Sequence, residues 1–237
     1  MKKLITLILG IAFVFGCTSN NNSDGDSSIY NYTQGANITD VDGNSYPTIV
    51  TNCSNQIWMQ KNLNVSRYRN GDIIPQVSNP TQWSNLTTGA WCYYNNDTAT
   101  GVIYGKLYNW YAVNDPRGLA PAGYHIPSDL EWISLINCLG GVGFASSKMK
   151  EIGTLHWLSP NTDATNLSGF TALPAGNRSF YDGTFSQIQR ETIWWSSTQA
   201  GASTDAWTRG LYYASGAAVS RNDMKKKFGL SVRCIKD

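Results

Sequence analysis

Short β-prone runs separated by turn residues fill the second half of this chain, and they constrain its fold most. Asp182-Gly183 lies between residues 179–181 and 184–185, a spacing that predicts a hairpin. Residues 192–197 read as a central strand, and residues 170–173, 206–213 and 230–235 read as further strands. The pattern predicts a sheet of many short, mostly antiparallel strands.

Two segments of the first half have helical periodicity instead. Tyr104, Leu107, Tyr108 and Tyr111 follow the i, i+3, i+4, i+7 spacing of one apolar helix face. The second helix is expected after Ser128, with Glu131 completing a capping box and Gly140-Gly141 ending it. Two main helices and many strands together predict an α+β domain.

Asp42-Gly43 marks another turn, between β-prone residues on either side, and residues 56–59 form a further extended piece. Residues 40–44 also resemble the start of a calcium loop. The twelfth position of such a loop requires a bidentate Glu, and here it is Thr51, so the turn is the favoured interpretation.

The first seventeen residues have the layout of an export signal. Lys2 and Lys3 precede an apolar run from Leu4 to Phe15, which is too short to span a bilayer. Gly16-Cys17 at its end resembles a bacterial lipobox, which implies that residues 1–16 are removed and the Cys17 thiol is acylated. The alternative is an ordinary signal peptide with a chance cysteine.

Residues 17–37 are rich in Asn, Ser, Asp and Gly, so they are expected to form a lipidated flexible tether. The folded domain is then residues 38–237. Ser19 at the second place after the cysteine resembles a signal for outer-membrane retention. We therefore expect a protein anchored by lipid at the outer membrane or cell surface of a bacterium.

Charge excludes one large class of function. Charged residues make up 14% of the chain, and loss of Lys2 and Lys3 leaves sixteen basic and sixteen acidic residues. A neutral chain lacks the basic surface that nucleic-acid binding requires. Its membrane contact is expected through the lipid on Cys17.

Four cysteines remain after Cys17, at positions 53, 92, 138 and 234. An exported protein with an even set of cysteines is expected to contain disulfides, and four cysteines allow three pairings. No pair has the C-x-x-C spacing of a zinc or redox site, and the sequence contains no phosphate-binding loop. We therefore expect no metal and no cofactor.

Motifs for catalysis are also missing. The chain has two histidines, and no G-x-S-x-G sequence supplies a serine nucleophile. Asp182 and Asp205 are the available carboxylate pair for glycoside hydrolysis, but nothing in the sequence fixes their separation, and Asp182 is needed by its turn. The sequence predicts a protein that is not an enzyme.

Seven ordered motifs resemble the Fibrobacter succinogenes major paralogous domain, a family found on exported lipoproteins. They are Gln56-Ile57-Trp58-Met59-x-x-Asn62-Leu63-Asn64, Tyr68-Arg69-Asn70-Gly71-Asp72, Tyr104-Gly105-x-Leu107-Tyr108-Asn109-Trp110, Gly123-Tyr124-His125-Ile126-Pro127-Ser128-Asp129-x-Glu131-Trp132, Gly169-Phe170-Thr171-Ala172-Leu173-Pro174-Ala175-Gly176, Trp194-Trp195-Ser196-Ser197-Thr198 and Ser231-Val232-Arg233-Cys234. Cys234 lies in the last of these motifs, and the resemblance also places Cys92 in a family motif, which makes these two the first choice for a disulfide.

A more distant resemblance is to formylglycine-generating enzymes and their C-type-lectin-like fold. Residues 125–132 resemble the Arg-Leu-Pro-Thr-x-x-Glu-Trp signature of that group, and Arg209-Gly210 resembles its Arg-Gly-Gly-Ser-Trp stretch. The resemblance implies the fold. It does not imply the oxidase chemistry, because residues 210–233 contain no cysteine.

The leading prediction is a non-catalytic binding module for glycan or protein. Flat aromatic rings with polar neighbours suit such ligands, and a strand turns Trp194 and Trp195 to opposite faces, so one of them can serve as an outward platform. The candidate ligand-binding residues are Arg178, Tyr181, Trp194, Trp195, Trp207 and Tyr212. The alternatives are a divergent relative of the formylglycine-generating enzymes and a structural component of an outer-membrane assembly.

Overall fold

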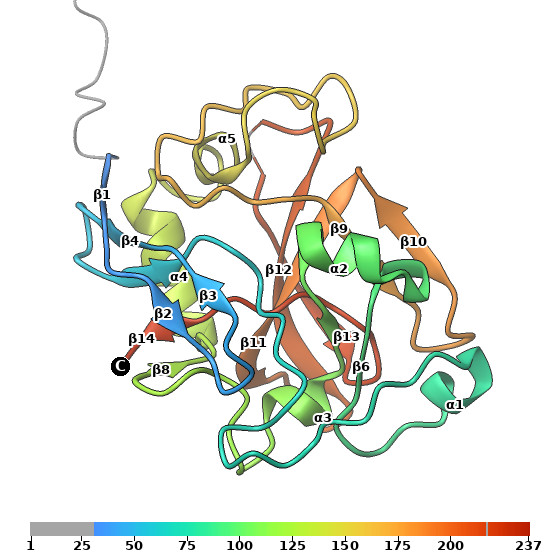
Figure 1. Ribbon diagram of the computed structural model, residues 1–237. Helices are drawn as coiled ribbons and strands as arrows, with labels where there is room; N and C mark the ends of the chain where they lie inside the picture. Colours follow the sequence, from blue (N-terminus) through green and yellow to red (C-terminus); the bar gives the residue numbers. More distant parts are fainter. Residues whose placement is uncertain (1–30, 217) are drawn as a thin grey trace, which may run out of the picture.

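The computed structural model describes residues 31–216 and 218–237, which form two five-stranded sheets with helices and long loops around them (Figure 1). The predicted signal segment and Cys17 lie outside the described residues. Residues 32–34, expected to be part of the flexible tether, are instead a strand of the fold, because they pair with residues 49–51. The strands are β1 (Tyr32–Gln34), β2 (Ile38–Thr39), β3 (Ser45–Tyr46), β4 (Thr48–Thr51), β5 (Ile57–Met59), β6 (Trp91–Cys92), β7 (Leu107–Tyr108), β8 (Tyr124–His125), β9 (Ala175–Arg178), β10 (Phe185–Ile188), β11 (Glu191–Gln199), β12 (Asp205–Tyr212), β13 (Ser220–Lys225) and β14 (Ile235–Lys236).

The first sheet joins the two ends of the described chain. Its order is β1-β4-β5-β14-β8, and all its pairs are antiparallel. The last strand, β14, thus lies between β5 and β8, with Ile235 opposite Trp58 and His125. The predicted turn at Asp42-Gly43 joins β2 and β3, and the Asp40 carboxylate accepts the backbone N–H groups of Asp42 and Asn44.

The second sheet has the order β10-β9-β11-β12-β13, with β11 at its centre as predicted. Only the β9–β11 pair is parallel. The hairpin predicted at Asp182-Gly183 is confirmed, because it connects β9 with β10. Residues 179–181, expected as strand, belong to that connection.

The helices are α1 (Pro80–Ser84), α2 (Thr98–Tyr104), α3 (Trp110–Val113), α4 (Asp129–Cys138) and α5 (Ala145–Met149), with a 3₁₀ turn at Tyr94–Asn96. α4 begins as predicted, since the Ser128 and Glu131 side chains form the capping box. It ends in a Schellman motif, in which Gly140 and Gly141 have positive φ and donate to the carbonyls of Asn137 and Ile136.

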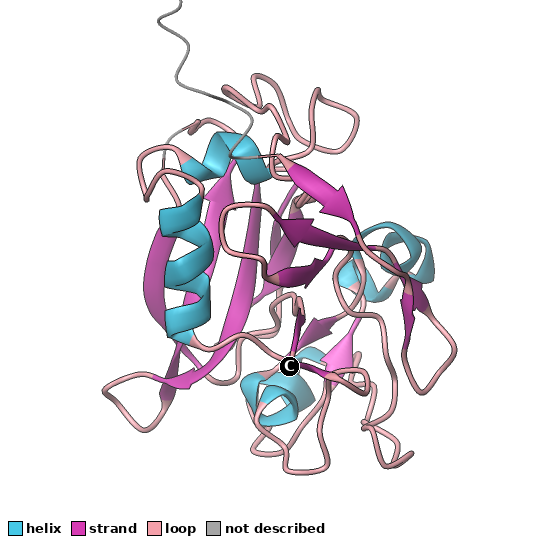
Figure 2. Ribbon diagram, turned by 90° about the vertical axis from the view of Figure 1, so that its left-hand side faces the viewer, coloured by secondary structure: helices cyan, strands magenta, loops and turns pink. Residues whose placement is uncertain are grey.

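A buried aromatic cluster joins the two sheets through α4. Trp132 of α4 lies 4.9 Å from Trp58 of the first sheet and 5.7 Å from Trp194 of the second, measured between ring centroids. Phe170 contacts all three rings. Figure 2 shows α4 lying against the strands of the second sheet. Aromatic rings therefore supply much of the core where the two sheets meet.

The helix predicted over residues 104–111 is wrong. α2 ends at Tyr104, because Gly105 has a φ of +76° and a Cβ there would lie 2.8 Å from the Leu63 carbonyl oxygen. Leu107 and Tyr108 then pair with β6, and Asn109 caps the separate helix α3. Apolar spacing suggested one helix, but glycine and asparagine divide the segment into three elements.

Two predicted strands are shorter than expected. Residues 170–173 make a single bridge, between Ala172 and Lys150. In residues 230–235, Leu230 and Ser231 form isolated bridges, and regular pairing begins only at Ile235. Apolar and polar residues alternate in this last segment because both of its sides are buried, each against different neighbours.

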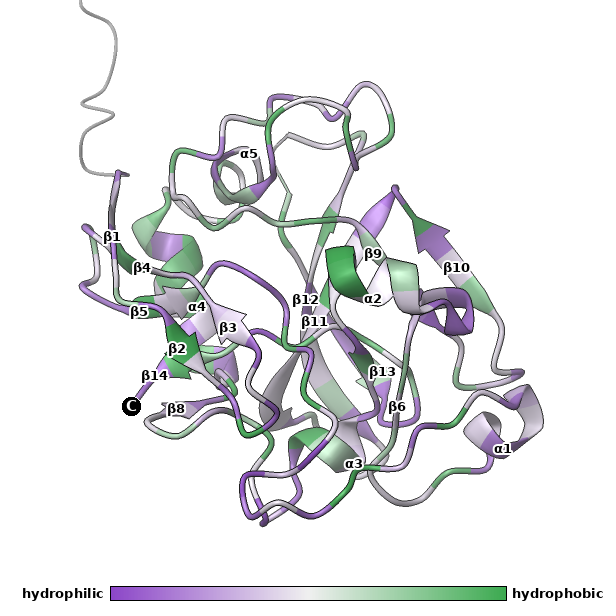
Figure 3. Cartoon of the chain, in the orientation of Figure 1, coloured by the Kyte–Doolittle hydropathy of each residue, from purple (hydrophilic) through white to green (hydrophobic). Residues whose placement is uncertain are grey.

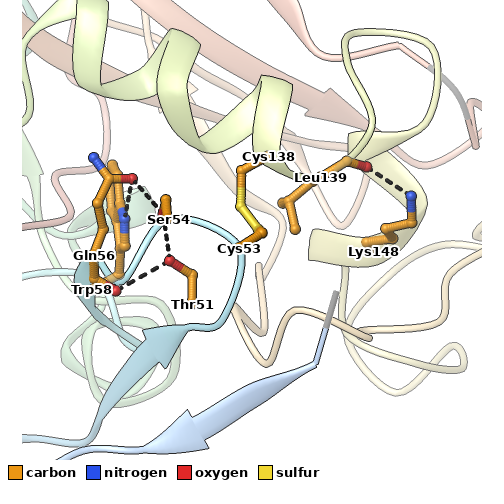
Figure 4. The surroundings of a disulfide bond; sticks show 8 residues. All are labelled: Thr51, Cys53, Ser54, Gln56, Trp58, Cys138, Leu139 and Lys148. Atoms are coloured by element: carbon orange, nitrogen blue, oxygen red, sulfur yellow. Dashed lines mark hydrogen bonds between the residues drawn. A yellow bond between two sulfur atoms is a disulfide. The ribbon is translucent and has the colours of Figure 1, made fainter. Parts of the chain in front are cut away.

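The disulfide joins Cys53 to Cys138, with the two Cα atoms 5.5 Å apart (Figure 4). It connects the β4–β5 loop to the last residue of α4. The expected Cys92–Cys234 pair is wrong, because these thiols are free and buried in different hydrophobic clusters. Burial raises the pKa of the Cys92 thiol to about 12, so it is inert at neutral pH.

The observed architecture confirms the α+β class. Within the described ranges, no helix combines the length and apolarity needed to cross a bilayer.

Candidate functional site

The two tryptophans expected to carry the ligand surface are core residues. Trp194 and Trp195 are both 0% exposed. The Trp194 indole N–H donates to Asn62 Oδ1 at 2.8 Å, and that of Trp195 donates to the Tyr108 carbonyl at 2.8 Å. They do point to opposite faces of β11, but α4 covers one face and the segment around Tyr108 covers the other. The expected outward platform is therefore wrong.

Arg178 is also buried, and its guanidinium holds loops together. It donates to the carbonyl oxygens of Gly183, Val77 and Ser78 at 2.9, 2.5 and 2.8 Å. The Trp83 and Phe185 rings lie 4.5 and 4.8 Å from its guanidinium carbon. With these partners and no solvent exposure, Arg178 is not available to a ligand.

The remaining three aromatic candidates do not form one surface. Trp207 and Tyr212 lie five residues apart on β12, which places them on opposite faces about 17 Å from each other. Tyr181 is 81% exposed in the β9–β10 connection, whereas Tyr212 lies beside the β10–β11 connection at the other end of β10. Trp207 is half-buried, and the Arg221 guanidinium stacks 3.5 Å from its ring.

A groove at the α3 end of the molecule combines an aromatic ring with accessible polar groups, which the candidate residues on the late strands do not. Its volume is about 450 Å³, within the range of small-molecule sites. It is lined by Ile73, Pro75, Thr87, Thr88, Gly89, Trp110, Tyr111, Asn114, Asp115, Pro116 and Arg117. We call it the α3 groove.

Asn109 fixes the floor of the α3 groove. Its Oδ1 accepts the backbone N–H groups of Ala90 and Ala112, and its Nδ2 donates to the Thr88 carbonyl at 2.8 Å. Gly89 closes the floor, because a Cβ there would lie 2.0 Å from the Tyr68 hydroxyl oxygen and 3.0 Å from the Ala112 Cα. The cap of α3 therefore also positions residues 87–90.

The rim of the groove is a β-turn that carries a fixed ion pair. Gly118 donates to the Asp115 carbonyl, with Pro116 and Arg117 at the two central positions. Arg117 binds both oxygens of Asp115 at 2.8 Å and Asp72 at 3.1 Å. Hydrogen bonds from Arg117 lower the pKa of the Asp115 carboxyl to about 2.

Tyr68 supports this rim from below. The Arg117 guanidinium carbon lies 4.0 Å from the centroid of the Tyr68 ring. Burial, and then the charge of Asp115, raise the pKa of Tyr68 to about 12, so its hydroxyl stays protonated. One guanidinium between two carboxylates thus fixes the geometry of the rim.

The wall of the groove combines a half-buried ring with accessible polar groups. Tyr111 and Trp110 are on α3, and Asn114 follows that helix. Trp110 is held by its indole N–H, which donates to the Ser196 carbonyl at 2.9 Å. Tyr111 is half-buried, and Thr87, Thr88 and Asn114 are exposed. A rigid ring next to hydroxyl and amide groups suits a ligand that is apolar on one face and rich in hydroxyls at its edges.

A second hollow, of about 290 Å³, lies beside Arg69. Its walls are mainly Val41, Val65 and residues 119–122. Arg69 already donates to the carbonyl oxygens of Ala120, Pro121 and Tyr124. This hollow thus has few polar groups to direct a ligand.

Neither histidine is part of a nucleophilic triad. His125 lies between the carboxylates of Glu131 and Asp237, at 2.8 Å from each, and the Glu131 carboxylate also caps α4. His156 pairs with Glu151 at 2.9 Å. Both histidines join neighbouring segments.

The α3 groove was missed because its residues come from three separate segments of the chain, around positions 73–75, 87–89 and 110–117. One signal was present: residues 114–118, Asn-Asp-Pro-Arg-Gly, place two charges in a turn of a chain with few charges. The aromatic residue of the groove, Tyr111, gives no separate signal, because the apolar spacing from Tyr104 to Tyr111 predicts a helix face.

Comparison with known proteins gives one family. The model described as Fibrobacter succinogenes major domain matches residues 52–236. No curated protein and no solved structure matches the chain.

Proposed function

We propose that this chain, which belongs to the Fibrobacter succinogenes major domain family, is a lipid-anchored binding module that holds a glycan in the α3 groove. The anchor is the acylated Cys17, and the location is the outer membrane or cell surface of a bacterium. The domain acts outside the cytoplasm without catalysing a reaction.

One observation carries the proposal: the Tyr111 ring shares the groove with Thr87, Thr88 and Asn114. A sugar ring presents an apolar face of C–H groups and an edge of hydroxyl groups. The aromatic ring offers area to the first, and the hydroxyl and amide groups offer directed hydrogen bonds to the second. A volume of about 450 Å³ suits one or two sugar rings.

The electrostatics of the rim favour binding over hydrolysis. A glycosidase needs one carboxyl group whose pKa is raised, so that it can donate a proton. Arg117 instead lowers the pKa of Asp115 to about 2, and hydrogen bonds from Asn70 and Arg117 lower the pKa of Asp72. Both groups are therefore permanent acceptors at neutral pH.

The groove is well placed for a tethered protein. β1, where the described chain begins, lies towards the α5 end of the molecule, and α3 lies at the opposite end (Figure 1). Figure 2 shows the same separation from another side. The groove therefore lies at the end of the domain away from the point where the chain enters the fold.

We further assign the α+β architecture to the C-type-lectin-like class of the formylglycine-generating enzymes. Support comes from residues 125–132, whose signature includes the capping box of α4. The likeness extends to the scaffold alone, because the region after Arg209 has no cysteine before position 234.

A glycan array probed with the mature protein tests this function. We expect Tyr111→Ala to weaken binding of any glycan found by about 2 kcal/mol, a roughly 30-fold increase in Kd. Tyr111→Phe should retain most of the affinity, because the ring remains. Thermal melting of each variant checks that the fold survives.

Tyr181→Ala is the matched control, since this exposed tyrosine lies outside the groove. It should bind as the parent protein does. A glycan whose affinity falls with Tyr181→Ala and not with Tyr111→Ala would place the site on the late strands. If the protein binds no glycan on the array but binds peptides, the ligand of the groove is a peptide and not a glycan.

A further inference from the structure

Four large apolar side chains are exposed around α5. Val142 and Phe144 precede this helix and are 63% and 65% exposed, and Ile152 and Leu155 follow it at 63% and 79%. α5 has five residues, so the two pairs flank a helix whose axis is only about 8 Å long. We call these four residues the α5 rim. Figure 3 shows hydrophobic segments in the loops at this end.

The loops that carry the rim are held firmly. Val219 donates its backbone N–H to the Val142 carbonyl. Asn161 Nδ2 donates to the carbonyl oxygens of Glu151 and Gly153, at 2.8 and 2.6 Å. Exposed apolar side chains on fixed loops cannot fold back into the core, and a group of them marks a contact surface more than isolated ones do.

The chain enters the described fold beside this rim. Tyr32 of β1 packs on Gly169, since a Cβ at position 169 would lie 2.4 Å from the Tyr32 ring. The same loop is bound to α5, because Thr165 and Ser168 donate to the carbonyl oxygens of Ser147 and Lys148. The point nearest to Cys17 along the chain therefore lies at the α5 end.

The length of chain between Cys17 and the fold indicates which surface the α5 rim contacts. Cys17 and Tyr32 are fifteen residues apart, which corresponds to about 50 Å at full extension. A bilayer that holds lipid on Cys17 is thus within reach of the α5 rim. This end needs the shortest stretch of chain, and the α3 end needs the longest.

Charge at the rim agrees with a lipid surface. Lys148 Nζ lies 5.9 Å from the Phe144 ring centroid and donates to the Leu139 carbonyl oxygen at 2.7 Å, which holds a positive charge beside the rim. His156 Nδ1 lies 2.9 Å from the nearby Glu151 carboxylate.

We propose that the α5 rim docks on the bilayer surface that holds the Cys17 lipid, with Phe144 and Leu155 inserted at the headgroup level. This inference rests on the lipid anchor of the proposed function. Docking fixes the orientation of the domain, and because α3 lies at the opposite end from α5, the groove then faces away from the membrane (Figure 1).

Site-directed spin labelling of the acylated full-length mature protein tests the docking. The protein is reconstituted in vesicles of phosphatidylethanolamine and phosphatidylglycerol, with one nitroxide on Leu155→Cys and, as a matched control, one on Tyr181→Cys. Cys92 and Cys234 are buried and do not take label in the folded protein. Power saturation with oxygen and with a water-soluble nickel complex reports the depth of each label.

We expect the label at 155 to gain oxygen access and lose nickel access on vesicles, and the label at 181 to stay in water. Phe144→Ser in the Leu155→Cys background should return the label at 155 towards water while the protein still floats with the vesicles. Thermal melting close to that of the parent protein confirms that Phe144→Ser is folded.

The outcomes separate the two ideas. Protein that does not float with vesicles overturns the lipid anchor, and the docking with it. Protein that floats with a water-exposed label at 155 overturns the docking alone. Dipolar broadening at 155 that grows with protein density on the vesicles assigns the rim to a second copy, which also overturns it.

Discussion

His125 Nδ1 lies 2.8 Å from Asp237 Oδ1, so an imidazole of β8 is tied to the last residue of the chain. The other ring nitrogen lies 2.8 Å from Glu131 Oε1, at the cap of α4. Burial acts to lower the pKa of His125, but its hydrogen bonds to the two carboxylates outweigh burial, and the pKa is raised.

A raised pKa means that the folded protein holds this proton more tightly than the unfolded chain does. The stability from His125 is therefore fully present below pH ~6.5 while the carboxylates are ionised, and it is lost as pH rises through the folded pKa. We expect the free energy of unfolding to fall across this range, measured by urea titration at several pH values. His125→Gln should remove that step.

Asp237→Asn is the matched variant for this effect. It leaves Glu131 as the single partner, so the step should move to lower pH and shrink. A His125→Gln protein that keeps the full step above pH ~6.5 would assign the titration to another group.

The Cys53–Cys138 bond closes a loop of 85 residues. The chain-entropy model gives a stabilisation of about 4–5 kcal/mol for a loop of this size. Cys53→Ala with Cys138→Ala should lower the midpoint of denaturant unfolding accordingly, measured by tryptophan fluorescence.

Thiol labelling gives an independent check of the pairing. The mature protein, unfolded without reductant, should label at Cys92 and Cys234 and at neither Cys53 nor Cys138. Peptide mapping that finds label on Cys53 or Cys138, and none on Cys92 and Cys234, would restore the pairing expected from the family motifs.

Alanine substitutions at Trp194 and Tyr181 compare the stability contributed by a core ring with that contributed by a surface ring. Trp194→Ala should cost roughly 3–5 kcal/mol of unfolding free energy, because the ring is fully buried against Trp132 and Phe170. Tyr181→Ala should change it by less than about 0.5 kcal/mol. Comparable losses in the two variants, measured by chemical denaturation, would contradict these burials.

Acylation of Cys17 is tested in cells, since this residue lies outside the described part of the structure. Cys17→Ala should release the protein from the membrane fraction, because two or three acyl chains each contribute about 0.8 kcal/mol for every buried CH₂. Mass spectrometry of the mature N-terminus shows the lipid directly. A mature protein with an unmodified thiol at Cys17, or with residues 1–16 still attached, would rule out the anchor.

Short-range signals in the sequence predicted the parts of the fold that depend on neighbouring residues. The Ser128–Glu131 capping box, the Gly140-Gly141 stop and the Asp42-Gly43 and Asp182-Gly183 turns all lie where expected. Each is a local hydrogen-bonding or backbone preference that needs no distant partner.

The helix over residues 104–111 failed for the opposite reason. Its apolar spacing is real, since Tyr104, Leu107 and Tyr108 are buried, but Tyr104 ends α2 whereas Leu107 and Tyr108 form β7, so they face different neighbours. The disulfide pairing likewise could not be predicted from the sequence, because four cysteines allow three pairings. Only the folded chain brings the Cα atoms of Cys53 and Cys138 to 5.5 Å from each other.

The sequence by itself determined the α+β class, the capped helix, the hairpin turns and membership of the family. The tertiary structure alone decided which aromatic rings are accessible. α4 and the segment around Tyr108 bury both faces of β11, so Trp194 and Trp195 serve the core. The α3 groove arises where residues 73–75, 87–89 and 110–117 meet, and local sequence preference cannot encode a contact between such distant segments.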